Sequence, residues 1–280
     1  MDGLLASCWT TAGDTGPHRA DQRSPWPLRT RVEAAAAAGF TGFGLLYEDL
    51  LTAADDLGMP GIRALLDDNG MTNLELEMLH GWWADGTERQ ESDLRRRTLL
   101  TAAEALNARH IKVGPDLANR PWDMDHWAAE FATLSAQAAD AGTRIAFEFL
   151  PWTNIHCLDL AASLIQAAGA PAGGLMVDIW HTERTHTPLS AIAALPPHHI
   201  TAVELNDGSA TLVGTHFEDT VRRRRPCGEG AFDVSGFIKA VRATGWTGPW
   251  GVEILSDELR RMPVAEAATT AYASAAKALA

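Results

Sequence analysis

The amino-acid sequence predicts an α/β protein, a single-domain (β/α)8 barrel over residues 1–280. Short apolar runs rich in Val, Ile, Leu and Phe alternate eight times with longer Ala-rich stretches that carry charges at helical spacing. Such alternation is typical of parallel strands joined by right-handed crossover helices. Eight units within 280 residues favour closure of the sheet into a barrel.

The eight apolar runs are the predicted strands. In chain order they cover 3–9, 42–47, 72–79, 110–114, 144–150, 174–180, 200–206 and 249–255. Apolar runs of this length are typical of buried strands. An open doubly wound sheet is the alternative, but no Gly-rich dinucleotide-binding loop follows the first run, so we favour the barrel.

The predicted helices lie between and after these strands. They cover 29–39, 61–70, 94–108, 127–142, 158–170, 188–196, 232–245 and 265–280. Several end at a glycine, such as Gly39, Gly142 and Gly245, which suits the left-handed backbone that often ends a helix. Residues 9–27 and 206–233 lack either pattern and are predicted as long loops, which are usually functional or disordered.

Charge and cysteine content limit the class of function. The net charge of -13 argues against a nucleic-acid partner, and no apolar run is long enough to cross a membrane. Cys8, Cys157 and Cys227 have neither disulfide-framework nor zinc-site spacing, which fits a reducing compartment. The first residues lack the basic region of a secretory signal. We therefore expect a cytoplasmic protein with no membrane partner.

Each of the last four predicted strands carries an acid within it or at its end. These acids are Glu148, Asp178, Glu204 and Glu253. Barrel active sites lie at the C-terminal ends of the strands, so we expect the four carboxylates to converge there. Buried acids need a partner or a metal ion, and oxygen ligands favour Mn²⁺ or Mg²⁺, with Fe, Co or Zn as alternatives. The other interpretation is that each acid is separately solvated or salt-bridged.

The motifs around these acids resemble a known family. The segments "AFEFLP", "MVDIWH", "VELNDG", "RPCGEGAFD" and "GWTGPWGVEI" occur in this order from strand five onward. Their order and spacing are similar to those of the xylose isomerase-like TIM barrel superfamily, the sugar phosphate isomerase/epimerase group. That family pattern has a Glu after strand five, Asp-x-x-His after strand six, and a His or Gln on strand seven.

The resemblance implies roles for particular residues. Glu148, Asp178 and Glu253 match metal-ligand positions, and Glu148 and Glu253 also match the pair that exchanges a substrate proton. His181 matches a substrate-binding histidine. Arg224 or Arg225 matches a basic residue that holds substrate oxygens. Glu204 departs from the family pattern, so it carries an added charge that a proton or a nearby base such as Lys112 would have to offset.

Further side chains near the predicted strand ends are candidates for substrate contact. Trp9, Trp152 and Trp180 could stack against a sugar or an aromatic ligand, or could pack loops together. His80 could contact substrate or be structural. Lys112 could bind substrate, but we favour a role in which it bridges the acids.

The resulting functional prediction is a metal-dependent isomerase or epimerase that acts on a small carbohydrate-like molecule. Glu148 and Glu253 would serve as acid and base, with the metal ion favouring the enediolate. One alternative is a lyase on the same scaffold, acting on an oxo-sugar, a C-glycoside or a 3-dehydroshikimate-like substrate. Another is a non-catalytic barrel subunit. A homo-oligomer is compatible with all three.

Overall fold

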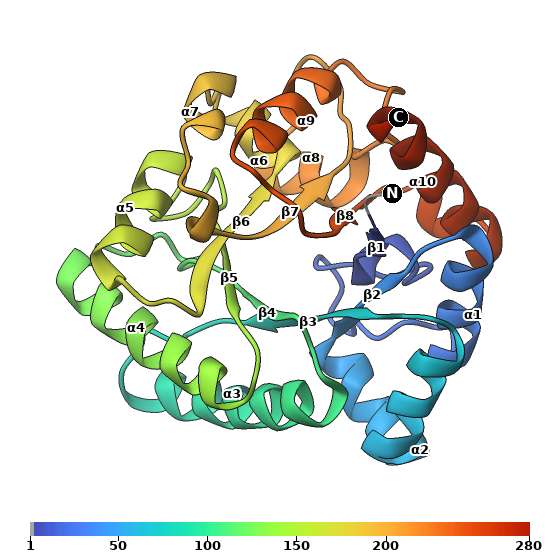
Figure 1. Cartoon of the computed structure of the whole chain (residues 1–280), viewed down its shortest axis with the longest axis horizontal. Helices are drawn as coiled ribbons and strands as arrows, with labels where there is room; N and C mark the ends of the chain where they lie inside the picture. The colour runs from blue at the N-terminus through green and yellow to red at the C-terminus, as the bar shows by residue number, and fades with distance from the viewer. Residues whose placement is uncertain (1–2) are drawn as a thin grey trace.

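The structure is a computed structural model that describes residues 3–280. Eight parallel strands form a closed barrel in which each strand pairs with the next along the chain and β8 pairs with β1 (Figure 1). The strands are β1 Leu4–Ala6, β2 Gly42–Leu46, β3 Asn73–Leu79, β4 His110–Val113, β5 Ile145–Glu148, β6 Gly173–Asp178, β7 Ile200–Leu205 and β8 Trp250–Val252. The predicted barrel is confirmed, and the open sheet is wrong.

The helices form a ring outside the barrel (Figure 1). They are α1 Leu28–Ala38, α2 Tyr47–Asp68, α3 Gly86–Leu106, α4 Met124–Asp140, α5 Leu158–Ala168, α6 Ile179–Arg184, α7 Leu189–Ala193, α8 His216–Arg223, α9 Val234–Ala243 and α10 Val264–Leu279. Short 3₁₀ helices are η1 Cys8–Thr10, η2 Pro197–His199 and η3 Leu259–Arg261. Among residues 3–280, none of these helices has the length and apolar character that crossing a membrane requires.

Strand periodicity separates the outer core from the barrel interior. Successive side chains of a strand point to opposite faces. On β5, Ile145 and Phe147 belong to the large apolar core, whereas Ala146 belongs to a separate small cluster with Met176 and Ala202. Glu148, Asp178 and Glu204 each lie two residues beyond a member of that small cluster, so they occupy the same interior face. The register supports this arrangement because Asp178 pairs with Glu204.

Several helices differ from the predicted ones: α3 begins at Gly86 and not at 94, and α6 was not predicted. Helix α2 begins at Tyr47, directly after β2, and not at residue 61 as predicted. It consists of two helical stretches that meet at a kink near Gly58, whose φ is 66°. Helix α8 lies inside the stretch predicted as loop. Its capping box joins Thr215 and Glu218, a sequence signal that precedes helices. The helix is short and mostly polar, so its composition resembles that of a loop.

Candidate active site

The four predicted acids meet at one end of the barrel. Glu148, Asp178, Glu204 and Glu253 each offer a carboxylate oxygen, and these oxygens all lie within 4.8 Å of one another. All four side chains are buried. Glu148 and Asp178 end their strands, Glu204 lies within β7, and Glu253 follows β8. We call these four residues the carboxylate cluster.

Asp178 is fixed from three directions. It caps helix α6, and its Oδ1 accepts hydrogen bonds from the Trp180 backbone N–H at 2.7 Å and the Asn206 amide at 2.9 Å. Its Oδ2 accepts from the Arg224 guanidinium at 2.6 Å. Burial disfavours its charge, but Arg224 and His181 outweigh burial and lower the pKa of Asp178. It therefore stays ionised.

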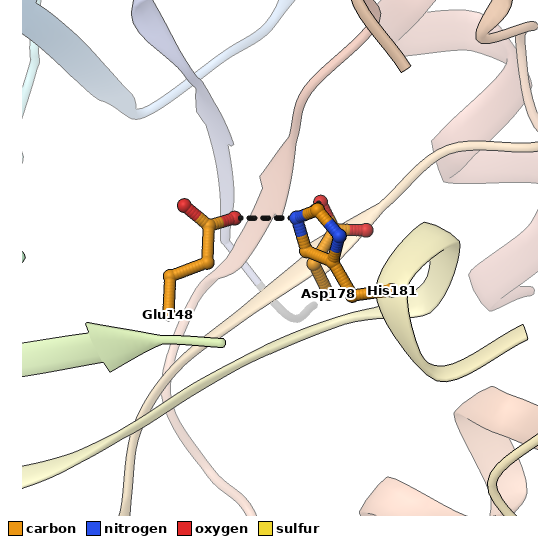
Figure 2. A group of neighbouring side chains, drawn as sticks. All are labelled: Glu148, Asp178 and His181. Carbon is orange, nitrogen blue, oxygen red and sulfur yellow. Dashed lines mark hydrogen bonds and ion pairs between the residues drawn. The ribbon is translucent and has the colours of Figure 1, made fainter. Parts of the chain in front are cut away.

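His181 lies beside Glu148 and Asp178 (Figure 2). Its Nε2 lies 3.2 Å from Glu148 Oε1 and 3.8 Å from Asp178 Oδ2. The imidazole is held by aromatic contacts with Phe149, Trp152 and Trp180. Burial opposes the charge of Glu148, but Lys112 and His181 outweigh it and lower the pKa of Glu148. A carboxylate and an imidazole are thus positioned to exchange a proton.

Of the two candidate arginines, only Arg224 reaches the carboxylate cluster. Its Nη1 lies 2.6 Å from Asp178 Oδ2 and 2.9 Å from Glu253 Oε2, and the side chain is buried. Arg225 is exposed and donates to the backbone carbonyl of Glu229. Arg224 has an extended backbone conformation, so the two neighbouring side chains point in opposite directions. The prediction for Arg225 does not agree with this geometry.

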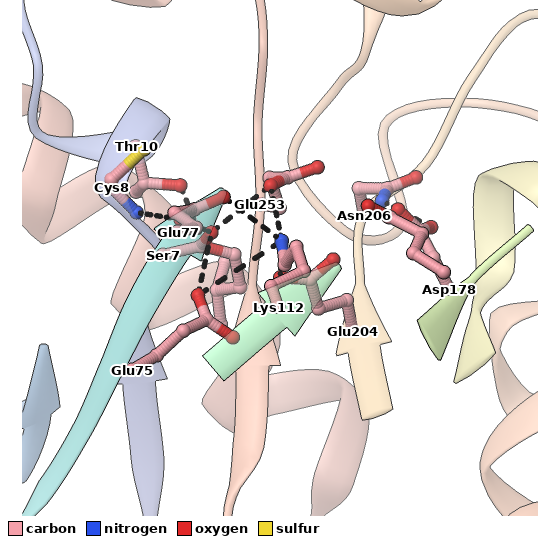
Figure 3. A network of polar contacts seen from close by, with 12 residues as sticks. Ser7, Cys8, Thr10, Glu75, Glu77, Lys112, Asp178, Glu204, Asn206 and Glu253 are labelled. Carbon is pink, nitrogen blue, oxygen red and sulfur yellow. Dashed lines mark hydrogen bonds and ion pairs between the residues drawn. The ribbon is translucent and has the colours of Figure 1, made fainter. Parts of the chain in front are cut away.

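Lys112 lies among four carboxylates in the barrel interior (Figure 3). Its Nζ lies 2.8 Å from Glu204 Oε1, 2.9 Å from Glu253 Oε1 and 3.3 Å from Glu77 Oε2. Glu75 is farther away, at 4.0 Å. Lys112 therefore bridges the acids, which is the role that the sequence favoured. Because the side chain has no exposed surface, it is not placed to bind substrate.

Strand β3 contributes two interior acids that the sequence reasoning missed. Glu75 pairs with His110 at 2.7 Å. Glu77 accepts from the Cys8 backbone N–H at 3.3 Å, and burial raises its pKa to about 8 although Lys112 opposes the shift. The signal was available, since both glutamates alternate with Leu74 and Leu76 at strand periodicity.

A cavity of about 400 Å³ opens above the carboxylate cluster. Polar groups in its lining are Gln22, Glu48, Glu77, His80, Arg95, Glu148, His181, Thr220, Arg224 and Glu253. Apolar walls are Trp9, Leu46, Met78, Leu117, Leu150, Trp152, Phe217, Val221 and Leu255. The lining thus includes the predicted Trp9, His80 and Trp152. Trp180 is fully buried behind His181 and does not line the cavity, which disagrees with its predicted role.

The donor set suits a divalent cation. All four ligand atoms are carboxylate oxygens, which bind Mg²⁺, Mn²⁺ and related ions. Glu204 Oε2 is buried without a hydrogen-bond partner, and such an atom requires compensation. Burial and repulsion from Glu253 raise the pKa of Glu204 well above its usual range. A bound cation would relieve both penalties.

Fold and site together define an α/β barrel protein with an acidic centre at the C-terminal ends of its strands. Residues 32–279 match the family model described as xylose isomerase-like TIM barrel. The chain belongs to this family.

Two curated relatives share one name. The chain is 30% identical over 247 residues to 3-dehydroshikimate dehydratase of Pseudomonas aeruginosa, and 28% identical over 242 residues to the protein of that name from Pseudomonas putida. Each match covers 84% of this chain and 37% of the relative. The chain therefore spans well under half the length of the curated relatives it matches.

Solved structures share the fold at low sequence identity. A xylose isomerase-like TIM barrel/4-hydroxyphenylpyruvate dioxygenase fusion protein aligns with a TM-score of 0.84 and 24% identity, covering 98% of this chain and 42% of that one. The IOLI protein with a bound zinc atom has a TM-score of 0.82 and 15% identity, covering 100% and 98%. D-psicose 3-epimerase has a TM-score of 0.74 and 15% identity, covering 99% and 98%.

Proposed function

We propose that this protein is a lyase that uses a divalent metal ion and removes water from a small hydroxylated carbonyl compound. Glu148 is the base in this proposal, and His181 carries the proton. The alternative named from the sequence thus becomes the leading function. The shared name of the two curated relatives supports the same reaction class.

The unequal surroundings of Glu148 and Glu253 carry this proposal. Glu253 Oε1 accepts from Lys112 at 2.9 Å and from Ser7 at 3.0 Å, and its Oε2 lies 2.9 Å from Arg224. These donors occupy both oxygens, so Glu253 is less available to approach a substrate proton. Within the described residues, Glu148 is bonded only to His181, through Oε1. One effective base suits elimination better than epimerisation, which needs two.

The elimination begins when Glu148 takes the proton from the carbon next to the substrate carbonyl. The electron pair of that C–H bond forms the new double bond, and the bond from the neighbouring carbon to its hydroxyl group breaks. His181, 3.2 Å from Glu148 Oε1, receives the proton and passes it to the departing hydroxyl group, which leaves as water. Glu148 and His181 end the cycle in their starting protonation states.

The remaining residues orient the substrate and hold the cation. Glu148, Asp178, Glu204 and Glu253 would hold the metal ion, and it would polarise the substrate carbonyl when bound. Arg224 fixes Asp178 and Glu253 and borders the cavity. The zinc atom of the similar IOLI protein supports a cation here, but Mn²⁺ and Mg²⁺ suit the oxygen-only donor set better.

The cavity favours a compact ring-shaped substrate with both apolar and anionic parts. Its wall includes Trp9, Trp152 and Phe217, which suit the face of a ring. Arg95 reaches the lining from helix α3, outside the carboxylate cluster, where it pairs with Glu48 at 2.6 Å and could also bind an anionic group of the substrate. A hydroxylated cyclic keto acid combines these features.

The direct experiment offers 3-dehydroshikimate to the purified protein with Mn²⁺ or Mg²⁺. Loss of water would create an aromatic ring, so ultraviolet absorbance reports the reaction. We expect turnover with the metal ion and none after chelation. No dehydration of 3-dehydroshikimate or of related cyclic keto acids, with the ion bound, would contradict the lyase.

An isomerase or epimerase is the second candidate. The likeness to D-psicose 3-epimerase supports it at the level of the barrel, and the proximity of Glu253 to Glu148 supports it at the site. Incubation with D-psicose or D-fructose in deuterated water tests this candidate. Deuterium incorporation without elimination would favour it over the lyase.

A further inference from the structure

The carboxylate cluster of this chain contains one more carboxyl group than a His or Gln at position 204 would give. Lys112 lies directly against that added carboxylate, because its Nζ is 2.8 Å from Glu204 Oε1 (Figure 3). Neither side chain has exposed surface. We propose that Lys112 is a built-in counter-charge for Glu204 and thereby sets the affinity of the carboxylate cluster for a divalent cation.

The charges in the barrel interior support this inference. Six carboxylates there are nearly or fully buried: Glu75, Glu77, Glu148, Asp178, Glu204 and Glu253. Among residues 3–280, Lys112 and Arg224 are the permanently charged cations that contact them. Arg224 forms ion pairs with Asp178 and Glu253, whereas Lys112 forms the ion pair with Glu204. Removing one partner of a buried ion pair leaves an uncompensated charge, which is strongly destabilising.

The two oxygens of Glu204 have different surroundings. Oε1 is held by Lys112, whereas Oε2 is buried without a partner. Lys112 can therefore neutralise the side chain through one oxygen while the other remains free for a metal ion. Glu253 is also shared, because Lys112 is 2.9 Å from its Oε1. Lys112 is thus a positioning residue that acts through two members of the carboxylate cluster.

This inference rests on the proposed metal centre, so the experiment separates the two. Four proteins are compared: wild type, Lys112→Met, Glu204→Gln and the double variant. Their melting temperatures are measured in a chelator, and Mn²⁺ affinity is measured by calorimetry. Lys239→Met removes one positive charge from an exposed position on α9 and serves as the matched control.

If Lys112 compensates the charge of Glu204, the two single variants should change Mn²⁺ affinity in opposite directions, and the double variant should restore it. Glu204→Gln should weaken Mn²⁺ binding roughly tenfold or more because Lys112 then acts as an unopposed positive charge near the ion. Lys112→Met should lower the melting temperature without metal and bind Mn²⁺ more tightly. The double variant should regain melting temperature over Lys112→Met and bind Mn²⁺ within about threefold of wild type. Lys239→Met should leave both quantities unchanged.

Equal Mn²⁺ affinity in Glu204→Gln and the double variant would overturn the inference, since Lys112 would then not influence the ion. If Lys112→Met alone does not fold, recovery of folding in the double variant supports compensation, and failure to recover contradicts it. Absence of Mn²⁺ binding to wild type would overturn the proposed metal centre, while the melting temperatures in chelator would still decide whether Lys112 neutralises Glu204.

Discussion

At the scale of single residues, Glu148 and Glu253 have the same side chain but different hydrogen-bond and ion-pair partners. Both are buried members of the carboxylate cluster. Glu253 faces Lys112, Ser7 and Arg224, whereas Glu148 faces one imidazole. Their positions could be predicted from the ends of two apolar runs. Their unequal surroundings could not, because the partners of Glu253 come from β4, the segment after β1 and the segment after α8.

Replacing Glu148 by glutamine should abolish turnover and leave the fold intact. The amide keeps the shape but cannot accept the substrate proton, and loss of a general base costs roughly 10²–10⁴-fold or more in rate. Initial rates, together with circular dichroism, measure both properties. Glu33→Gln, on the exposed side of α1, is the control. Wild-type rates in Glu148→Gln would refute the assignment of the base.

Replacing Glu77 by glutamine should change how stability depends on pH. Its pKa of about 8 in the folded protein exceeds the value near 4 of an unfolded glutamate. The folded state therefore holds the proton more tightly and loses stability as pH rises between these values. Melting temperatures of the metal-free protein from pH 5 to 8 should fall less in Glu77→Gln than in wild type. An identical pH slope in both proteins would show that Glu77 does not titrate there.

At the scale of elements, the sequence predicted the strands well and the helices within long irregular segments only in part. Apolar runs predicted all eight strands, because a barrel strand is covered by helices on its outer face. Helix α8 escaped prediction because it is short and polar, although it leads directly to Arg224. Glu75 and Glu77 of β3 were not predicted as interior acids, because their alternation with leucines is also typical of a strand whose polar face is solvated.

Replacing Thr215 by alanine should destabilise helix α8. The Thr215 side chain accepts from the Glu218 backbone N–H, and Glu218 reaches back to the Thr215 backbone N–H. Loss of such a cap typically costs about 1 kcal/mol. Hydrogen exchange should therefore become faster in residues 216–223, with catalytic rate reduced because α8 positions Arg224. Thr269→Ala, an exposed hydroxyl on α10, is the control. Unchanged exchange within α8 would show that the cap is dispensable.

At the scale of the whole molecule, the barrel combines an apolar outer core with a charged interior. The outer layer of strands and helices forms one large apolar cluster. Inside, β3, β5, β6, β7 and the residue after β8 direct six buried carboxylates toward the same region. Sequence could predict the apolar layer from composition and periodicity. It could not reveal how strands distant along the chain share Lys112 and Arg224, because that depends on barrel closure.

Metal binding should stabilise the whole barrel. An ion that binds only the folded state adds about 2.7 kcal/mol at a free concentration one hundred times its Kd. For a domain of this size we expect a rise in melting temperature of roughly 5 °C or more on adding Mn²⁺. A chelator should reverse it, and Asp178→Asn should abolish it. An equal shift in Asp178→Asn would place the bound ion elsewhere.

The most direct test is the anomalous diffraction of crystals soaked in Mn²⁺. We expect one strong anomalous peak within bonding distance of carboxylate oxygens from Glu148 and Asp178, with Glu204 and Glu253 completing the site. A peak bonded to other residues, or no peak in crystals exposed to saturating Mn²⁺, would contradict the metal centre on which the proposed chemistry depends.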